Sequence, residues 1–164
     1  MKRMLSALIL LALLSQQANA NEKFVLESLM NSKGPDSLPA KILALLKVKE
    51  KVDLNNCQKR RHYKKAEMND FFGAVAINLN DDGENDYLIY PKKFCENMFG
   101  AHAIPYWVAL SSSSGYKIVR KGTTDVVTIL DSKTNGAKDI LEIYGVFQDK
   151  TRLVFTGKEY KSAE

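Results

Sequence analysis

The sequence is poor in the residues from which active sites and transition-metal sites are most often built. It holds two histidines, two cysteines and one tryptophan in 164 residues. His62 and His102 stand in no H-x-x-x-H or H-E-x-x-H spacing, no serine stands in a G-x-S-x-G frame, and no glycine-rich nucleotide loop is present. These absences argue against metalloproteases, serine hydrolases and nucleotide-binding proteins, and we expect a protein that is not an enzyme.

Long apolar runs are also scarce. The first of them, Leu5–Leu14, follows Lys2 and Arg3 and precedes the small-x-small sequence Ala18-Asn19-Ala20. A run of this length is too short for the ~20 residues that a helix needs to span a bilayer. The order of the three parts is that of a secretory signal peptide. We therefore expect residues 1–20 to be cleaved, no membrane span to remain, and the protein to be periplasmic or secreted.

Charge of one sign is not in large excess. The formal net charge is +5, and two of the positive charges lie in the expected leader. A nucleic-acid-binding domain usually has a stronger basic footprint, so we expect no nucleic-acid partner. The densest basic run, Gln58–Lys65, could contact phosphates of a surface polysaccharide or an acidic protein face, or could simply be a solvated segment. The sequence leaves these alternatives open.

Cys57 and Cys95 predict one disulfide bond. An even number of cysteines in an exported chain usually forms bridges. In the chain-entropy model, closing a loop of this length stabilises the fold by roughly 3–4 kcal/mol. A redox or metal pair is the alternative, but the two cysteines have no C-x-x-C spacing and no third soft ligand nearby.

The apolar pattern changes from helical to strand-like along the chain. Residues 21–50 contain two helical segments, of which the first is Glu22–Met30. In the second the apolar residues Leu38, Ile42, Leu45 and Leu46 form one stripe. Residues 71–161 contain short β-rich runs that are separated by turn residues. We predict a single α+β domain over residues 21–164, with one or two N-terminal helices packed on an antiparallel meander sheet of about six or seven strands.

The strongest local signal is the stretch Gly73–Tyr90. Apolar runs at Ala74–Leu79 and Tyr87–Tyr90 flank a polar loop, which predicts two strands joined by a hairpin. The loop offers oxygen atoms at alternate positions, with Gly83 at the sixth, and calcium takes six to eight such ligands. The candidate ligands are Asn78, Asn80, Asp82, the Glu84 carbonyl and Asp86.

The composition of this loop predicts weak binding at best. Ile89 stands where an EF-hand places its bidentate glutamate, and two of the ligands are neutral amides. We expect a Kd of ~10⁻⁴–10⁻³ M for Ca²⁺. Asparagine, aspartate and glycine are also what any tight loop between strands uses, so a calcium site and a plain turn both stay open. The same spacing of polar residues and glycine recurs at Asp131–Asp139. There Lys133 occupies a ligand position and, as a donor without a lone pair, excludes a metal.

The first loop resembles the calcium-loop signature of FG-GAP/VCBS-type (integrin-like) repeats, D-x-N-x-D-G-x-x-D followed by an apolar strand. It is also similar to a group of small exported bacterial proteins built around one such loop, mostly without an assigned activity. The matching pieces are Asn78–Tyr90, Cys95 with Pro105–Trp107, and Phe155–Tyr160. Asn78 replaces the usual leading aspartate and Asp81 the usual glycine. The resemblance implies a hairpin with structural calcium and no particular reaction.

These observations predict a non-enzymatic exported binding or structural module with a weak Ca²⁺ loop. Its partner would be an unknown protein or another component of the cell envelope. A periplasmic inhibitor or immunity protein directed against a cell-wall hydrolase is the alternative, because small size and one disulfide fit it equally well. A small hydrolase that uses Asp82, Asp86 or a histidine is the third hypothesis.

Overall fold

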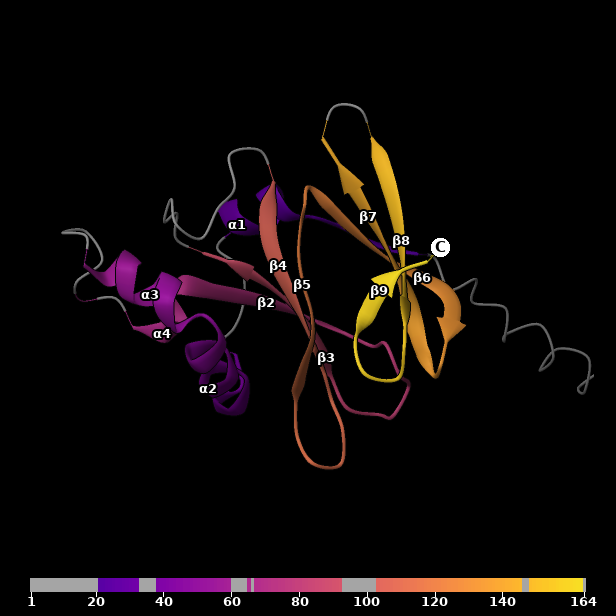
Figure 1. Cartoon of the computed structure of the whole chain (residues 1–164), viewed down its shortest axis with the longest axis horizontal. Coiled ribbons are helices and arrows are strands. Elements are labelled where there is room, and N and C mark those ends of the chain that lie inside the picture. Colours follow the sequence, from indigo (N-terminus) through magenta and orange to yellow (C-terminus); the bar gives the residue numbers. More distant parts are fainter. Residues whose placement is uncertain are drawn as a thin grey trace, which may run out of the picture.

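The computed structural model describes residues 21–32, 38–59, 65, 67–92, 103–145 and 148–163. Within these residues the chain forms an α+β structure of four short helices and two antiparallel sheets (Figure 1). No helix in the described part is long and apolar enough to cross a membrane. The expected leader (1–20), most of the basic run (60–64), Cys95 and both histidines lie outside the described residues.

The first sheet holds four strands in the order β2-β3-β4-β5. Their bounds are β2 Phe72–Ile77, β3 Asp86–Pro91, β4 Ile104–Leu110 and β5 Lys117–Thr124. The second sheet has the order β1-β6-β7-β8-β9. Its strands are β1 Glu22–Val25, β6 Val126–Thr134, β7 Ala137–Tyr144, β8 Asp149–Phe155 and β9 Tyr160–Ser162.

The predicted α+β class is confirmed, but the predicted single meander sheet is wrong. The chain passes from β5 in one sheet to β6 in the other through one residue, Asp125. The central strand β4 is buried along five consecutive residues, so both faces of its sheet need cover. Helices between residues 40 and 71 cover one face, and the second sheet, together with the helix at residues 26–31, covers the other, which gives three layers (Figure 1).

The helices are shorter than the sequence suggested. They are α1 Leu26–Asn31, α2 Ala40–Lys49, α3 Lys51–Gln58 and α4 Met68–Phe71. The apolar stripe of α2 is confirmed, because Ile42 and Leu46 are fully buried. The prediction that residues 22–25 are helical is wrong, since these residues form β1 and pair with β6, where Glu22 lies opposite Ile129.

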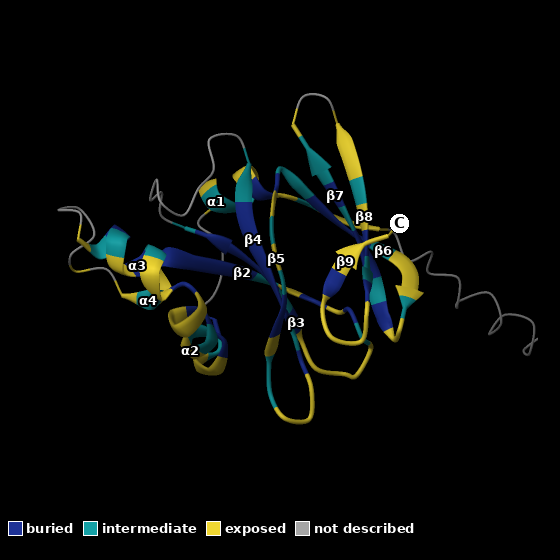
Figure 2. Ribbon diagram, in the orientation of Figure 1, coloured by how far each residue is buried: buried dark blue, intermediate teal, exposed yellow. Residues whose placement is uncertain are grey.

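Two apolar clusters hold the layers together. The inter-sheet cluster lies between the two sheets and includes Leu88, Tyr106, Val119 and Ile140. The helix-side cluster packs Ile42 and Leu46 of α2 against the other face of the four-stranded sheet, and its largest member is Trp107, whose ring meets Phe72 edge-on at 5.3 Å. Figure 2 shows the buried residues running along β2 and β4 in the middle layer.

Candidate functional site

The predicted hairpin at Gly73–Tyr90 is confirmed. Strands β2 and β3 pair antiparallel from Phe72 opposite Pro91 to Ile77 opposite Asp86. The loop turns through Asp81 and Gly83, whose φ angles are 55° and 86°. Glycine tolerates such a left-handed conformation without strain, and aspartate tolerates it better than most residues do.

Asp86 anchors the loop from inside the protein. Its side chain is fully buried, and Oδ2 accepts a hydrogen bond of 2.7 Å from the Leu79 amide. Oδ1 accepts two more bonds of 2.8 Å from the amide and hydroxyl of Ser111, the residue that follows β4. A buried carboxylate costs free energy unless donors surround it, and these three donors compensate that cost. Asp86 therefore fixes the loop to the end of β4.

The other candidate ligands bind one another and the loop backbone. Asn78 Oδ1 accepts a hydrogen bond from the Asp81 amide at 2.9 Å, and Asn80 Oδ1 accepts one from the Asp82 amide at 3.2 Å. Asn80 Nδ2 donates to Asp82 Oδ2 at 2.8 Å. A hydrogen bond from the Glu84 amide lowers the pKa of Asp82. The loop is thus a set of Asx turns, and its side-chain oxygens accept N–H and O–H bonds.

The described geometry fits a turn better than a metal cage. Among the described residues, no group of three or more His, Cys, Asp or Glu side chains is arranged to hold a metal ion. The Asn80 amide N–H groups point at Asp82 and Ser111, where a cation would need oxygen atoms. The side chain of Glu84 is exposed. Calcium binding by Asn78, Asn80, Asp82, Glu84 and Asp86 therefore stays an untested hypothesis, and this geometry favours the alternative, a plain turn.

The second loop with this residue spacing, Asp131–Asp139, lies against the first. The Lys138 amide donates to the Leu79 carbonyl at 2.8 Å, and Lys133 forms an ion pair with Asp81. Asp139 is buried like Asp86, and its Oδ2 accepts bonds from the residue seven positions earlier, Ser132, and from Arg152. Burial opposes ionisation of Asp139, but these hydrogen bonds outweigh it and lower the pKa. The repeated pattern thus marks two turns that dock on each other.

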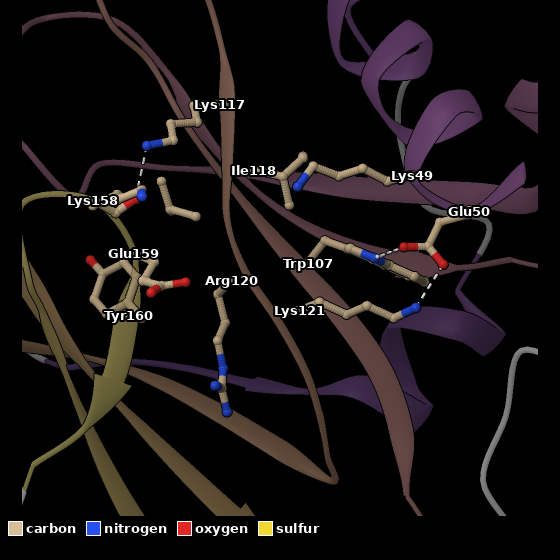
Figure 3. Close-up of a pocket in the computed structure, with 11 residues that line it drawn as sticks. Lys49, Glu50, Trp107, Lys117, Ile118, Arg120, Lys121, Lys158, Glu159 and Tyr160 are labelled. Carbon is tan, nitrogen blue, oxygen red and sulfur yellow. Dashed lines mark hydrogen bonds and ion pairs between the residues drawn. The ribbon is translucent and has the colours of Figure 1, made fainter.

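A groove of about 570 Å³ runs beside the outer edge of β5, between the end of α2 and the β8–β9 hairpin (Figure 3). We call it the cationic groove. Its charged lining consists of Lys49, Lys117, Arg120, Lys121, Lys158, Glu50 and Glu159. Cations outnumber acids in this lining, and all four lysines are exposed. The groove therefore presents positive charge to solvent.

One acid of the groove is already used inside the fold. Glu50, at the junction of α2 and α3, is 4% exposed. Its Oε1 accepts a bond of 2.9 Å from the Trp107 indole, and its Oε2 pairs with Lys121 at 2.7 Å. Lys121 also lies 5.8 Å from the centre of the Trp107 ring. These contacts hold one wall of the groove against the four-stranded sheet.

A buried glutamate holds the other side of β5. Glu142 of β7 is fully buried and accepts hydrogen bonds from Arg120, Tyr106 and Tyr144. Burial and then the Glu142 carboxylate raise the pKa of Tyr144 to about 12, and raise that of Tyr106 as well. The backbone of β5 approaches so closely that a Cβ on Gly122 would lie 2.6 Å from Glu142 Oε1. This network fixes β5 against the second sheet.

The predicted disulfide residue Cys57 does not line the cationic groove. Cys57 is buried at the end of α3, and its predicted bridge to Cys95 stays a prediction because Cys95 lies outside the described residues. Local sequence patterns do not indicate the groove, because its lysines come from residues 49, 117–121 and 158. The one local signal was the cluster Lys117, Arg120 and Lys121 on a short strand.

Comparisons with protein-family models, curated proteins and solved structures found no match for this chain.

Proposed function

We propose that this chain is a non-enzymatic exported binding protein and that the cationic groove beside β5 is its binding surface. The observation that carries the proposal is the convergence of exposed lysines from α2, β5 and the β8–β9 hairpin on one groove. Three separate parts of the chain supply the same charge to one place. Such a surface attracts an acidic partner over several ångströms and orients it before contact.

The placement of the acids supports binding rather than catalysis. Asp86, Asp139 and Glu142 are all fully buried, and each accepts hydrogen bonds from two or more parts of the fold. A general acid or base must reach a substrate proton. These carboxylates instead hold strands and loops together. Export rests on the sequence of residues 1–20, and the partner is then a component of the envelope or the surroundings of the cell.

A charge-reversal experiment tests the groove. Components of the cell envelope are offered to the immobilised protein, the bound component is purified, and its Kd is measured by titration. In the triple variant Lys49→Glu, Lys117→Glu, Lys158→Glu we expect the Kd to rise at least tenfold. We also expect the wild-type Kd to rise with salt, because exposed charges are screened beyond roughly 8–10 Å at physiological ionic strength.

The matched control reverses three exposed lysines that do not line the groove. Lys23→Glu, Lys65→Glu, Lys150→Glu changes the net charge equally, and we expect it to leave the Kd within about twofold. Equal losses in both triple variants would contradict a defined binding surface. Turnover of the bound component would contradict the non-enzymatic role. A cell-wall hydrolase that is bound through the groove and loses activity would make the protein its inhibitor, as the alternative hypothesis holds.

A further inference from the structure

We propose that the partner adds an acidic, extended segment to the four-stranded sheet as a fifth strand beside β5. This inference rests on the proposed function, because it specifies how the cationic groove holds its partner. In the described part of the chain β5 pairs with β4 alone, so its other edge is free. A free strand edge carries unpaired N–H and C=O groups, which are a template for another strand.

The cationic groove lies over this edge. Its lining follows β5 from Lys117 to Lys121 and takes in residues on both sides of the strand (Figure 3). A segment in the groove would therefore run along the strand rather than across it. Neighbouring strands lie ~4.8 Å apart, so such a segment could form main-chain hydrogen bonds with β5.

The cations flank the edge on both faces of the sheet. Lys121 lies opposite Trp107 in the β4–β5 register, on the face that the helices cover. Lys117 lies opposite Leu110, which packs against the inter-sheet cluster, and its Nζ donates to the Lys158 carbonyl in the β8–β9 hairpin. The register shifts between Val108 and Ala109, which separates these two parts of the strand.

This two-sided arrangement matches the side-chain pattern of a strand. Successive side chains of an extended segment point to opposite faces. An acid at one position would meet Lys49 and Lys121, and an acid three positions further along, which points to the opposite face, would meet Lys117 and Lys158.

The charge of β5 favours an acidic segment over a second copy of this chain as the added strand. A second copy of this chain pairing through β5 would bring its own lysines opposite those of the first copy, and like charges directly opposite each other destabilise a strand pair. Lysine on an edge strand is a known protection against such self-pairing. An acidic segment has the complementary charge and meets no such repulsion.

The test uses a capped ten-residue peptide of glutamate, threonine and valine. Its glutamates stand at positions 2, 3, 6 and 7, so that each face of the extended peptide carries two. Binding is followed by fluorescence anisotropy and by amide hydrogen exchange in the purified protein. We expect the edge amides of β5 to exchange at least tenfold more slowly with peptide, while the amides of β2, the opposite edge of the same sheet, stay unchanged.

Two matched peptides separate charge from strand pairing. Methylation of four consecutive central amide nitrogens keeps every glutamate but removes the donors of both peptide edges, and we expect it to raise the Kd at least tenfold. Replacement of the glutamates by glutamine keeps the backbone and should raise the Kd similarly. Lys117→Glu, Lys121→Glu should abolish binding of the acidic peptide, and the circular dichroism spectrum of this variant reports whether it is folded.

The outcomes distinguish the inference from the proposed function. Equal affinity for the methylated and unmethylated peptides would overturn strand addition. So would binding of inorganic polyphosphate in the groove without any binding of the acidic peptide. In both cases a natural partner that depends on Lys49, Lys117 and Lys158 would leave the proposed function standing. A natural partner whose Kd is unchanged by substitution of those lysines would overturn the proposed function itself.

Discussion

At the scale of the residue, buried carboxylates connect separate elements of this protein through hydrogen bonds and ion pairs. Asp86 joins the β2–β3 loop to the end of β4, Glu142 joins the two sheets, and Glu50 joins the helices to Trp107 and Lys121. Each acid connects parts of the chain that are remote in sequence or belong to different elements. Since burial of a charged group is unfavourable without partners, loss of any one of these acids leaves donors unsatisfied.

Asp86→Ala should lower the free energy of unfolding by about 3 kcal/mol, because the Leu79 and Ser111 amides would lose their acceptor inside the protein. Urea unfolding followed by tryptophan fluorescence measures the change. Asp82→Ala is the control in the same loop, and we expect a much smaller loss because Asp82 is exposed. Equal losses in the two variants would contradict the anchoring role of Asp86.

Asp139 should make the protein lose stability in acid. Its pKa is lowered in the folded state, so the unfolded chain binds more protons as the pH falls below about 4, near the ordinary pKa of aspartate. The stabilisation is therefore present above that pH and disappears as the pH drops through the folded pKa. Unfolding midpoints in urea between pH 2.5 and 6 should fall less steeply in Asp139→Asn than in the wild type. Parallel curves would refute this contribution.

At the scale of the element, the hairpin was predictable and the sheet-to-sheet arrangement was not. Strands β2 and β3 and their loop lie within Gly73–Tyr90, so pattern and turn residues act over a short stretch. Strand β1 is different, because Glu22 pairs with Ile129 and no neighbouring residue signals that contact. The passage from β5 to β6 at Asp125 looks like an ordinary turn in the sequence. The cationic groove depends on this long-range placement, and local patterns could not reveal it.

The hairpin loop also gives a test of the calcium prediction. A site with a Kd of ~10⁻⁴–10⁻³ M would stabilise the folded protein by ~1.4–2.7 kcal/mol in 10 mM Ca²⁺. Because the loop oxygens already accept hydrogen bonds from the loop itself, we expect calcium to change the Tm by less than about 1 °C. A rise of several degrees that Asp82→Ala removes would contradict this expectation and establish the site.

Strand β5 should be sensitive to a single added methyl group. In Gly122→Ala the new Cβ would lie 2.6 Å from Glu142 Oε1 and 2.7 Å from Tyr106 Cε1, so the strand or these two buried side chains must shift. We expect a loss of roughly 1–3 kcal/mol in the free energy of unfolding, together with weaker binding in the cationic groove. Thr123→Ala, at an exposed neighbouring position, is the control and should behave like the wild type.

At the scale of the whole molecule, the four-stranded sheet is the middle one of three layers. The four-stranded sheet contributes to both apolar clusters, with Trp107 on the helix side and Tyr106 on the inter-sheet side. The helices themselves are short, and α1 and α4 have only six and four residues. Isolated helices of such length are marginal in water, so their stability comes from packing on the sheet. A cross-link between the helical layer and the rest of the chain would therefore affect the whole fold.

Reduction should weaken the protein if Cys57 and Cys95 are bridged as predicted. We expect dithiothreitol, or Cys57→Ser, to lower the free energy of unfolding by roughly 3–4 kcal/mol. Mass spectrometry after alkylation without reductant should find no modified cysteine in the native protein. Two alkylated cysteines under denaturing, non-reducing conditions would contradict the bridge. An unchanged urea midpoint after complete reduction would contradict its stabilising role.

The single residue between β5 and β6 leaves very little slack in the chain. The Asp125 amide donates to the Ile143 carbonyl at 3.2 Å, and its own carbonyl accepts a bond of 3.0 Å from the Leu26 amide. One residue offers only two soft backbone dihedrals, and here hydrogen bonds restrain both of its neighbouring peptide groups. A pulling force applied along β5 would therefore be transmitted directly to β6 and to the five-stranded sheet, because no flexible linker separates the two strands.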